Sequence, residues 1–379
     1  MGYRVLRKGV TLFGVLLPFT FSAASVFSIS LMVKELSQNF SVTVPVVLWA
    51  IPIDFIGGAI GGITLGYLAD AFGRRPVLLA SGIIFSVSVI MTSFVKALWE
   101  MYLAWFLVGF GVNAENGVSY PVVVEYLHSF RGSFGGFMQG LYFIGYLIDV
   151  LLSYAIPAWR YYFLVLGVLS LAASLTAIFV PETATITRER GLGLRGLNRR
   201  LALMTIGLSA VVIGAFMFSV PLLMLVPSFI EDMGLSVKWL TFLSIVGFVG
   251  FVVGGWLSDL KGRLRTTMAL SLLGLISSTA LVFTVKGYAG LAALTVSFFA
   301  TGYFSFAGVW ASETYPPELR ATGTNLVFLV GRLIGGFSPT IAAVIYASSL
   351  RVGTGITCVI ANSLAIIGGL IYLKANETS

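Results

Sequence analysis

The stretch Gly66-Tyr-Leu-Ala-Asp70-Ala-Phe-Gly73-Arg74 decides the fold, because it recurs as Gly255-Trp-Leu-Ser-Asp259-Leu-Lys-Gly262-Arg263 in the second half of the chain. Each copy follows one long apolar run and precedes another, so each predicts a tight, charged turn between two hydrophobic helices. A signature repeated at matching places in both halves indicates that the chain is an internal duplication.

The composition excludes a water-soluble globular protein. Apolar residues make up 58% of the chain, charged residues only 10%, and the mean hydropathy is +0.99, whereas soluble domains carry about 25% charged residues. The apolar runs are long and continuous, which favours membrane-spanning helices over the short alternating segments of a membrane β-barrel.

We predict twelve spanning helices, because about 20 apolar residues are needed to cross a bilayer. They are residues 10–33, 44–69, 76–95, 99–124, 132–157, 160–180, 201–227, 237–258, 266–285, 288–311, 321–347 and 352–373. The one long connection divides the chain into an N-terminal six-helix bundle (1–180), a cytoplasmic linker (181–200) and a C-terminal six-helix bundle (201–379). The expected fold class is an all-α membrane protein of two pseudo-symmetric bundles.

The lysines and arginines predict the orientation. Most of them fall on one side of the membrane if both termini are cytoplasmic, as the positive-inside rule requires. We therefore expect a multi-pass protein of the plasma membrane, with the net charge of +8 explained by topology. Nucleic-acid binding is not expected, because the cations are spread over many short loops.

The doubled G-x-x-x-D-x-x-G-R pattern resembles the turns that join helices 2 and 3, and helices 8 and 9, in the major facilitator superfamily. The resemblance covers the whole chain and implies that these charges latch the two bundles together at the cytoplasmic side. The first glycine of each copy, Gly66 or Gly255, would let helices approach closely, and the second, Gly73 or Gly262, would permit the turn. The aspartate of each copy would accept hydrogen bonds from a neighbouring helix N-terminus or from an arginine. The alternative is that the arginines only determine topology.

A second repeated pattern supports the first. It consists of a glutamate followed by an arginine, Glu125 with Arg131 and Glu313 with Arg320, and it resembles the E-x(6)-R turns of the sugar-porter and organic-ion branches. The pattern predicts a network of ion pairs. In this network Glu125 would pair with Arg74 or Arg131, and Glu313 with Arg263 or Arg320. Its alternative is a static surface cluster. The gating candidates are Gly66, Asp70, Gly73, Arg74, Arg75, Glu125, Arg131, Gly255, Asp259, Gly262, Arg263, Glu313 and Arg320.

Four charged residues, Asp54, Glu115, Asp149 and Arg332, fall well inside predicted helices and away from the helix ends. A charge there costs about 2.5 kcal/mol or more and usually marks a pathway. Asp54, Glu115 and Asp149 are the candidates for proton coupling. Glu115 is favoured because Gly109-Phe-Gly111-Val-Asn-Ala-Glu115 partly resembles the helix 4 segment G-x-G-x-G-G-E of metabolite:proton symporters. The alternatives are a structural hydrogen bond for Asp54 and Glu115, and a lip residue in water for Asp149.

Arg332 is the fourth, and it lies where organic-ion and aromatic-acid transporters often hold a helix 11 arginine. Its planar guanidinium suits a carboxylate, although it could instead be the charge partner of a membrane acid. Aromatic and amide side chains on the helices expected to line a cavity complete the set. The substrate-binding candidates are Arg332, Asn113, Asn116, Tyr142, Tyr146, Tyr303 and Trp310.

These patterns predict a secondary transporter that takes up a small organic anion, a carboxylate or an aromatic acid, together with protons. The alternatives are a proton-coupled sugar transporter, a drug or organic-cation exporter, and a transporter-like sensor. An enzyme is not expected, because His128 and Cys358 are the only histidine and cysteine and no nucleophile triad or metal set is available. We expect a monomer whose partners are its substrate, protons and the bilayer, with no cofactor and no metal.

Overall fold

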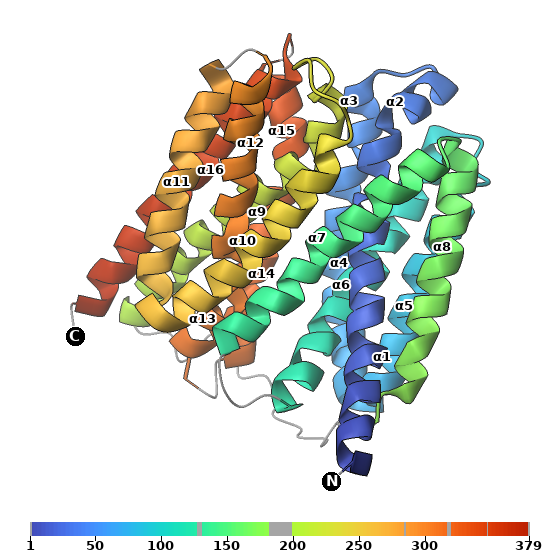
Figure 1. Cartoon of the computed structure of the whole chain (residues 1–379). Coiled ribbons are helices and arrows are strands. Elements are labelled where there is room, and N and C mark those ends of the chain that lie inside the picture. Colours follow the sequence, from blue (N-terminus) through green and yellow to red (C-terminus); the bar gives the residue numbers. More distant parts are fainter. Residues whose placement is uncertain are drawn as a thin grey trace. The chain divides into compact units, whose positions relative to one another are not determined.

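The computed structural model describes residues 2–126, 131–181, 199–283, 286–316, 320–346 and 348–377 (Figure 1). All regular elements in these ranges are helical. They are α1 Gly2–Phe27, α2 Ile29–Phe40, α3 Val44–Leu48, α4 Ala50–Phe72, α5 Arg74–Thr92, α6 Leu98–Tyr126, α7 Arg131–Ala155, α8 Trp159–Leu175, η1 Thr176–Phe179, α9 Arg199–Phe229, α10 Trp239–Lys261, α11 Arg263–Phe283, α12 Tyr288–Ala300, η2 Thr301–Phe304, α13 Ala307–Thr314, α14 Arg320–Gly336, α15 Ser338–Ile345 and α16 Leu350–Glu377.

The twelve predicted spans are confirmed. Among the described residues, eleven helical segments are long and apolar enough to cross a membrane, and α6, with 29 residues, supplies the remaining one. Several spans consist of successive short helices; the span Tyr288–Thr314, for example, contains α12, η2 and α13. An apolar run can therefore continue where the helix itself is interrupted. The first span, Gly9–Phe40, joins α1 and α2 and is longer than the predicted 10–33.

The chain divides into two compact units. Unit 1 comprises Met1–Ser129 and Leu141–Arg188, and unit 2 comprises Phe130–Gly140 and Glu189–Ser379. Helix α7 therefore belongs to both: its first residues pack within unit 2, whereas the rest of the helix packs within unit 1.

Unit 1 is held together by close packing of α4 against α6. A Cβ atom added to Gly57 would lie 2.1 Å from the carbonyl oxygen of Phe106, and one added to Gly61 would lie 2.0 Å from that of Phe110. Only glycine allows this approach, which is how helices in a bilayer gain contact without a hydrophobic driving force. The crossing places the middle of α6, including Glu115, deep inside the unit.

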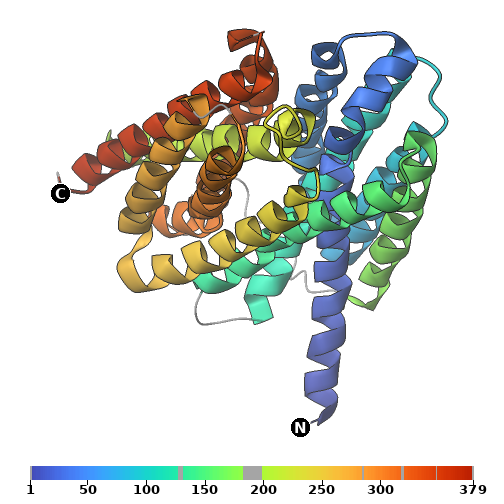
Figure 2. The ribbon, with the colours of Figure 1, turned by 45° about the horizontal axis from the view of Figure 1, so that its top comes forward.

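In unit 2, α16 packs along α9 and α11 (Figure 2). Glycines again allow the close approach. A Cβ on Gly207 would lie 2.7 Å from the carbonyl oxygen of Gly368, and a Cβ on Gly368 would lie 2.5 Å from the carbonyl oxygen of Gly207. Two facing glycines bring the backbones of α9 and α16 into direct contact.

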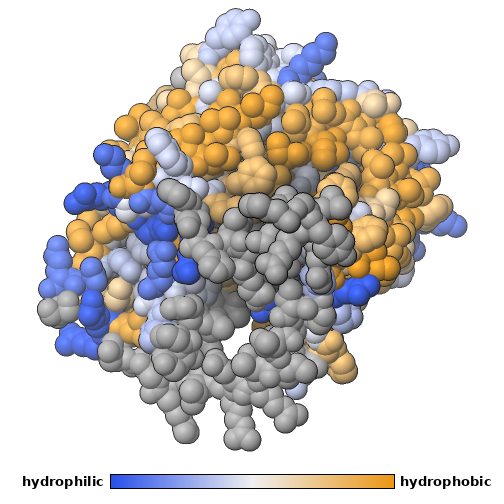
Figure 3. Space-filling view, turned by 60° about the horizontal axis from the view of Figure 1, so that its bottom comes forward, coloured by the Kyte–Doolittle hydropathy of each residue, from blue (hydrophilic) through white to orange (hydrophobic). Residues whose placement is uncertain are grey.

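The surface carries the apolar belt that a bilayer requires. Large side chains such as Phe72, Phe283 and Tyr288 expose about three quarters of their surface. In the space-filling view, hydrophobic side chains cover a broad band of this face and hydrophilic side chains gather towards its margins (Figure 3). Large apolar patches of this extent are rare on soluble monomers.

Candidate functional site

The two copies of the repeated signature form the same turn. Gly73 ends α4 with φ 102° and precedes α5, and Gly262 ends α10 with φ 89° and precedes α11. Positive φ values are strained for residues with a Cβ atom. The predicted role of both glycines in the turns is therefore confirmed.

The leading glycines of the two copies differ. A Cβ on Gly255 would lie 2.3 Å from the carbonyl oxygen of Gly132 and 2.9 Å from the Cα of Gly136, so α7 and α10 touch through their backbones. At Gly66 the predicted close approach is absent, because an added Cβ would meet no heavy atom within 4 Å in the described structure.

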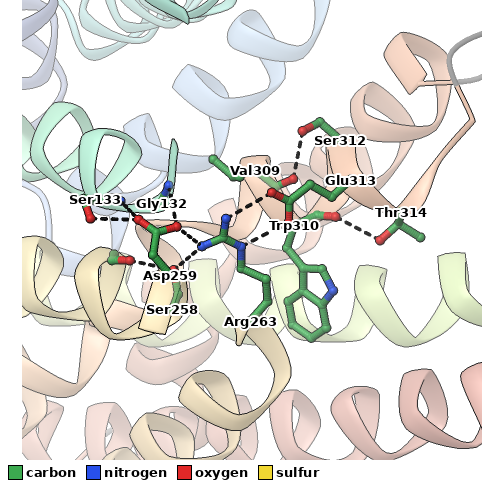
Figure 4. A network of polar contacts seen from close by, with 11 residues as sticks. Gly132, Ser133, Ser258, Asp259, Arg263, Val309, Trp310, Ser312, Glu313 and Thr314 are labelled. Atoms are coloured by element: carbon green, nitrogen blue, oxygen red, sulfur yellow. Dashed lines mark hydrogen bonds and ion pairs between the residues drawn. The ribbon is translucent and has the colours of Figure 1, made fainter. Parts of the chain in front are cut away.

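Asp259 binds the N-terminus of α7 (Figure 4). Its Oδ1 accepts a hydrogen bond from the Gly132 backbone N–H at 3.1 Å, and its Oδ2 accepts from the Ser133 N–H and the Ser133 hydroxyl, both at 2.7 Å. The first N–H groups of a helix have no partner within the helix, so an acceptor with a negative charge is doubly favourable there. The prediction that Asp259 accepts from a helix N-terminus is confirmed.

Arg263 joins Asp259 to a second carboxylate. Its Nη1 donates to Asp259 Oδ1 at 2.7 Å and to the Ser258 hydroxyl at 2.6 Å, while Nε and Nη2 donate to the two oxygens of Glu313 at 3.1 and 3.0 Å. The fork of the guanidinium thus binds Glu313 with two parallel bonds, the strong geometry for this pair. The predicted pairing of Glu313 with Arg263 is present.

This group of residues, Gly132, Ser133, Ser258, Asp259, Arg263 and Glu313, is called here the Asp259 network. The side chains of Asp259 and Arg263 expose only 13% and 14% of their surface, whereas Glu313 exposes 40%. Removing one partner of a mostly buried pair leaves a poorly solvated charge, which costs more than loss of an exposed pair. The network therefore fastens α7 to the α10–α11 turn with a stability that depends on Asp259.

The corresponding network of the first repeat lies partly outside the described residues. The side chains of Asp70, Glu125 and Arg320 are among those not described, as is that of Asn116. Arg74 and Arg75 are half-buried at the start of α5, and Arg131 is exposed at the start of α7.

Glu115 is fully buried on α6. Its Oε1 accepts a hydrogen bond from the Ser119 hydroxyl at 2.5 Å, and the side chain of Ser22 on α1 also contacts it. Its Oε2 is buried and lacks a hydrogen-bond partner in the described structure. Among the described residues, the hydrogen-bonding groups recorded against this carboxyl group are the hydroxyls of Ser119 and Ser22.

The other two acids lie in different surroundings. Asp54 exposes 3% of its surface and lies at the α4–α6 crossing, where its carbonyl oxygen would meet a Cβ on Gly109 at 1.9 Å. Asp149 is fully buried and accepts a hydrogen bond from the hydroxyl of Tyr162. The alternative interpretation of Asp149 as a lip residue in water is wrong, because no part of its side chain reaches the surface.

Arg332 is half-buried on α14, a helix that packs against Phe216 of α9. Gly331 and Gly335 flank it and pack against Phe216, whose Cβ would lie 2.2 Å from a Cβ on Gly335. The ring of Phe216 meets Phe304 edge-on at 4.6 Å and Phe328 at 6.3 Å. Phe328 precedes Arg332 by one helical turn and so lies on the same side of α14. The rings of Phe216, Phe304 and Phe328 thus form an aromatic cluster from α9, η2 and α14, and Arg332 shares a side of α14 with Phe328.

The remaining substrate-binding candidates are mostly enclosed. Tyr303 is fully buried and stacks on Phe218, and Trp310, 3% exposed, meets the ring of Tyr372 at 4.8 Å. Tyr146 is fully buried, whereas Tyr142 is half-buried between the rings of Phe19 and Phe27. The side-chain amide of Asn113 donates to the carbonyl oxygen of Gly109 in its own helix. Arg332 and Tyr142 are the described candidates that retain substantial exposure.

Sequence reasoning missed Ser133, although Arg131, two residues before it, is part of the second repeated pattern. Ser133 is the third residue of α7, and the sequence alone does not show which acid its hydroxyl and backbone N–H contact. Sequence reasoning also missed the neighbours of Asp149, because aromatic residues are common throughout the chain.

Comparisons with known proteins agree with this architecture. The family model described as "Major Facilitator Superfamily" matches residues 15–373 of this chain. A niacin transporter of Acinetobacter baylyi is 24% identical over 378 residues, with 86% of this chain and 84% of that protein covered. A 3-(3-hydroxy-phenyl)propionate transporter of Escherichia coli is 25% identical over 378 residues, with 91% and 88% covered.

A solved structure shares the fold. The proton:xylose symporter XylE, bound to 6-bromo-6-deoxy-D-glucose, superposes with a TM-score of 0.74 at 18% identity, covering 97% of this chain and 95% of the symporter. The relatives named above are transporters and not enzymes. Together with the family match over nearly the whole chain, this shows that the chain belongs to the Major Facilitator Superfamily of membrane transporters.

Proposed function

We propose that this transporter takes up a small aromatic carboxylate together with protons, by alternating access. It acts as a monomer in the plasma membrane, with both termini in the cytoplasm. Arg332 binds the carboxylate of the substrate, and Glu115 carries the coupled proton. The proposal rests above all on the position of Arg332, a half-buried cation one turn from Phe328 on a helix that packs against Phe216.

The chemistry of this position suits an aromatic acid. A guanidinium outside bulk water is stabilised by an anion, and its planar fork binds both oxygens of a carboxylate. Aromatic rings at edge-to-face distance offer an apolar surface for the ring of such a substrate. The two relatives support the same class, because niacin and 3-(3-hydroxyphenyl)propionate each combine an aromatic ring with a carboxyl group.

The gating part of the proposal rests on the Asp259 network. Four hydrogen-bond donors from α7 and α11 converge on the Asp259 carboxylate, and Arg263 extends the network to Glu313 on α13. A cluster of this kind holds α7 in one position and must open if α7 moves. The network therefore acts on the conformational equilibrium and not on the substrate.

The first experiment measures equilibrium binding of niacin and of 3-(3-hydroxyphenyl)propionate to purified protein, with xylose as a neutral comparison. Arg332→Ala should abolish binding of both acids. Arg332→Lys should weaken it about tenfold or more, because loss of a charged hydrogen bond costs about 1.5–3 kcal/mol. Arg199→Ala, which removes an exposed arginine at the start of α9, is the matched control for net charge.

Two results would refute the assignment. Binding of either acid to Arg332→Ala with the affinity of the parent protein would remove Arg332 from the site. Binding of xylose but of neither acid to the parent protein would favour the sugar-transporter alternative and would leave the Asp259 network unaffected.

A further inference from the structure

Within unit 2, the last turns of α16 lie beside the first turns of α9 and α11. A Cβ atom on Gly369 of α16 would lie 2.8 Å from the sulfur of Met268, in the second turn of α11. At the start of α9, Arg200 donates a hydrogen bond to the side-chain oxygen of Asn376 of α16 at 2.9 Å. The beginnings of two helices and the end of a third therefore meet at one place.

On α11, a cation stands at the end of an exposed apolar face. Arg265 is exposed in the first turn, and Leu272 and Ile276 expose 52% and 61% of their surface. Residues at i, i+7 and i+11 lie on the same side of an α-helix, because seven and eleven residues are close to two and three full turns. The outward side of α11 therefore leads from apolar side chains to a guanidinium group.

The same arrangement occurs on α16, which packs along α11 in the opposite direction. Ile367 and Leu370 expose 53% and 50% of their surface, and Lys374 is exposed in the last turn. These three residues are spaced at i, i+3 and i+7 and share one side of the helix. Because α16 ends where α11 begins, the two adjacent apolar faces each reach a cation at the same end.

The stability of α11 does not explain Arg265. A cation in the first turn of a helix is opposed by the helix dipole, and the first turn of α11 contains no acid to offset it. The nearby carboxylates of Asp259 and Glu313 bind Arg263, which lies two residues earlier and so projects from a different side of α11. An anion from outside the chain would suit this position.

A topological role explains the sign of these charges but not their placement. The positive-inside rule requires cations near the ends of spanning helices, whichever side of the helix they lie on. Here Arg265 and Lys374 each continue an exposed apolar face. Glu377 adds one exposed acid at the end of α16, whereas Arg200 adds a further exposed cation beside it.

We propose that the adjoining ends of α11 and α16 bind an anionic phospholipid. The headgroup phosphate lies between Arg265 and Lys374, whose guanidinium and ammonium groups donate charged hydrogen bonds to its oxygens. The acyl chains follow the exposed faces of the two helices into the bilayer. Basic positions between spanning helices are suited to lipid headgroups of this charge.

The cations, and not the apolar faces, make the site selective. Any phospholipid can cover exposed leucine and isoleucine side chains, but a zwitterionic headgroup carries a cation of its own, which Arg265 and Lys374 repel. A bound anionic lipid holds the end of α16 against α11 and so stabilises unit 2. This inference does not depend on the substrate or on the coupled ion.

Thermal unfolding of the purified full-length protein in detergent tests the proposal without substrate. Phosphatidylglycerol should raise the melting temperature until the site is saturated, and phosphatidylcholine with the same acyl chains should raise it less, because a ligand stabilises the state that binds it. Arg265→Gln combined with Lys374→Gln should lower the apparent affinity for phosphatidylglycerol roughly tenfold. The matched control combines Lys96→Gln with Lys238→Gln, two exposed lysines outside these helix ends, and should retain the parent affinity.

Three results would overturn the proposal. The first is equal affinity of phosphatidylglycerol for the parent protein and for the Arg265→Gln, Lys374→Gln variant. The second is an equal effect of the two lipids on the parent. The third is an equal melting shift from soluble glycerol 3-phosphate, which would make the cluster a site for free anions.

Salt decides the question if the double variant does not fold. The proposed contacts lie at the surface, where salt screens interactions between charges. High sodium chloride should therefore weaken the binding of phosphatidylglycerol to the parent protein, and unchanged binding would contradict the proposal.

Discussion

At the scale of single residues, the sequence predicts which kind of interaction a charged side chain makes better than it predicts which residue is the partner. The duplicated aspartate, glycine and arginine predict that Asp259 accepts hydrogen bonds from a helix N-terminus or from an arginine, and in the structure it accepts from both. Nothing in the pattern identifies Ser133 as the donor, because this contact depends on where α7 begins in space. For Tyr146, the residue type suggests contact with substrate, whereas in the structure its side chain is completely buried and interacts electrostatically with Asp149.

The first prediction at this scale concerns Asp259. Asp259→Asn removes the charge that Arg263 and the α7 N-terminus share, so the conformational equilibrium should shift by about 1–3 kcal/mol. We expect the rate of transport to fall while equilibrium binding of niacin stays within a few-fold of the parent value. Ser133→Ala should have a smaller effect in the same direction, because the Ser133 backbone N–H still reaches Oδ2.

The control is Asp232→Asn, which removes an exposed acid from the connection between α9 and α10. It should change neither rate nor binding. If Asp259→Asn transports as fast as the parent, the repeated signature has only a topological role. The same substitution at Asp70 tests whether the first repeat works in the same way.

At the scale of elements, hydropathy predicts the spans but not their interruptions. The span Tyr288–Thr314 contains α12, η2 and α13, and the span Leu326–Ile345 contains a break between α14 and α15 at Phe337. Apolar residues continue through both interruptions, so composition carries no signal there. Pro339 in the first turn of α15 is the one local cue, because proline is favoured at a helix start.

A repeated pair of arginines shows what else the sequence leaves hidden. Arg160 at the start of α8 donates to the carbonyl oxygens of Ser93 and Val95, at the end of α5. Arg351 at the start of α16 donates to those of Leu281 and Val282, near the end of α11. Each cation satisfies carbonyl groups at a helix C-terminus, where the dipole favours positive charge. From the sequence these arginines are only cations on the side opposite to the termini.

The prediction at this scale concerns the α4–α6 crossing. In Gly61→Ala the new Cβ would lie 2.0 Å from the carbonyl oxygen of Phe110, and backbone atoms cannot rotate away. Overpacking of this kind costs about 1–3 kcal/mol or more, which exceeds the roughly 1 kcal/mol that alanine gains over glycine in a helix. We expect a clearly lower melting temperature for the purified protein in detergent.

Gly62→Ala is the matched control on the next residue. Its Cβ would lie 4.0 Å from the Cβ of Asn113, an ordinary contact, so the melting temperature should stay unchanged or rise slightly. Equal melting temperatures for Gly61→Ala and the parent would show that α4 and α6 do not pack this closely.

At the scale of the whole molecule, duplication is what makes the fold predictable. Two copies of one turn and twelve apolar runs determine the family, and the family match covers residues 15–373. The assignment of α7 to both units is not readable from the sequence, because it depends on which helices the glycines at its start and centre face. For the same reason, the sequence predicts which acids lie in the membrane but not which of them are enclosed.

The last prediction tests the proposal that the transporter couples a proton to its substrate through Glu115. Glu115 is buried and is hydrogen-bonded by the hydroxyls of Ser119 on α6 and Ser22 on α1, and we propose that it gains and loses the coupled proton as the hydration of its surroundings changes. Glu115→Gln mimics the protonated form permanently. In proteoliposomes it should still exchange niacin across the membrane in counterflow but should no longer accumulate niacin under an imposed pH gradient. Asp54→Asn, measured in parallel, should retain accumulation. If Glu115→Gln accumulates niacin and Asp54→Asn does not, Asp54 is the proton carrier. If both variants accumulate niacin, neither acid is the carrier, because neither is then needed to convert the pH gradient into a substrate gradient.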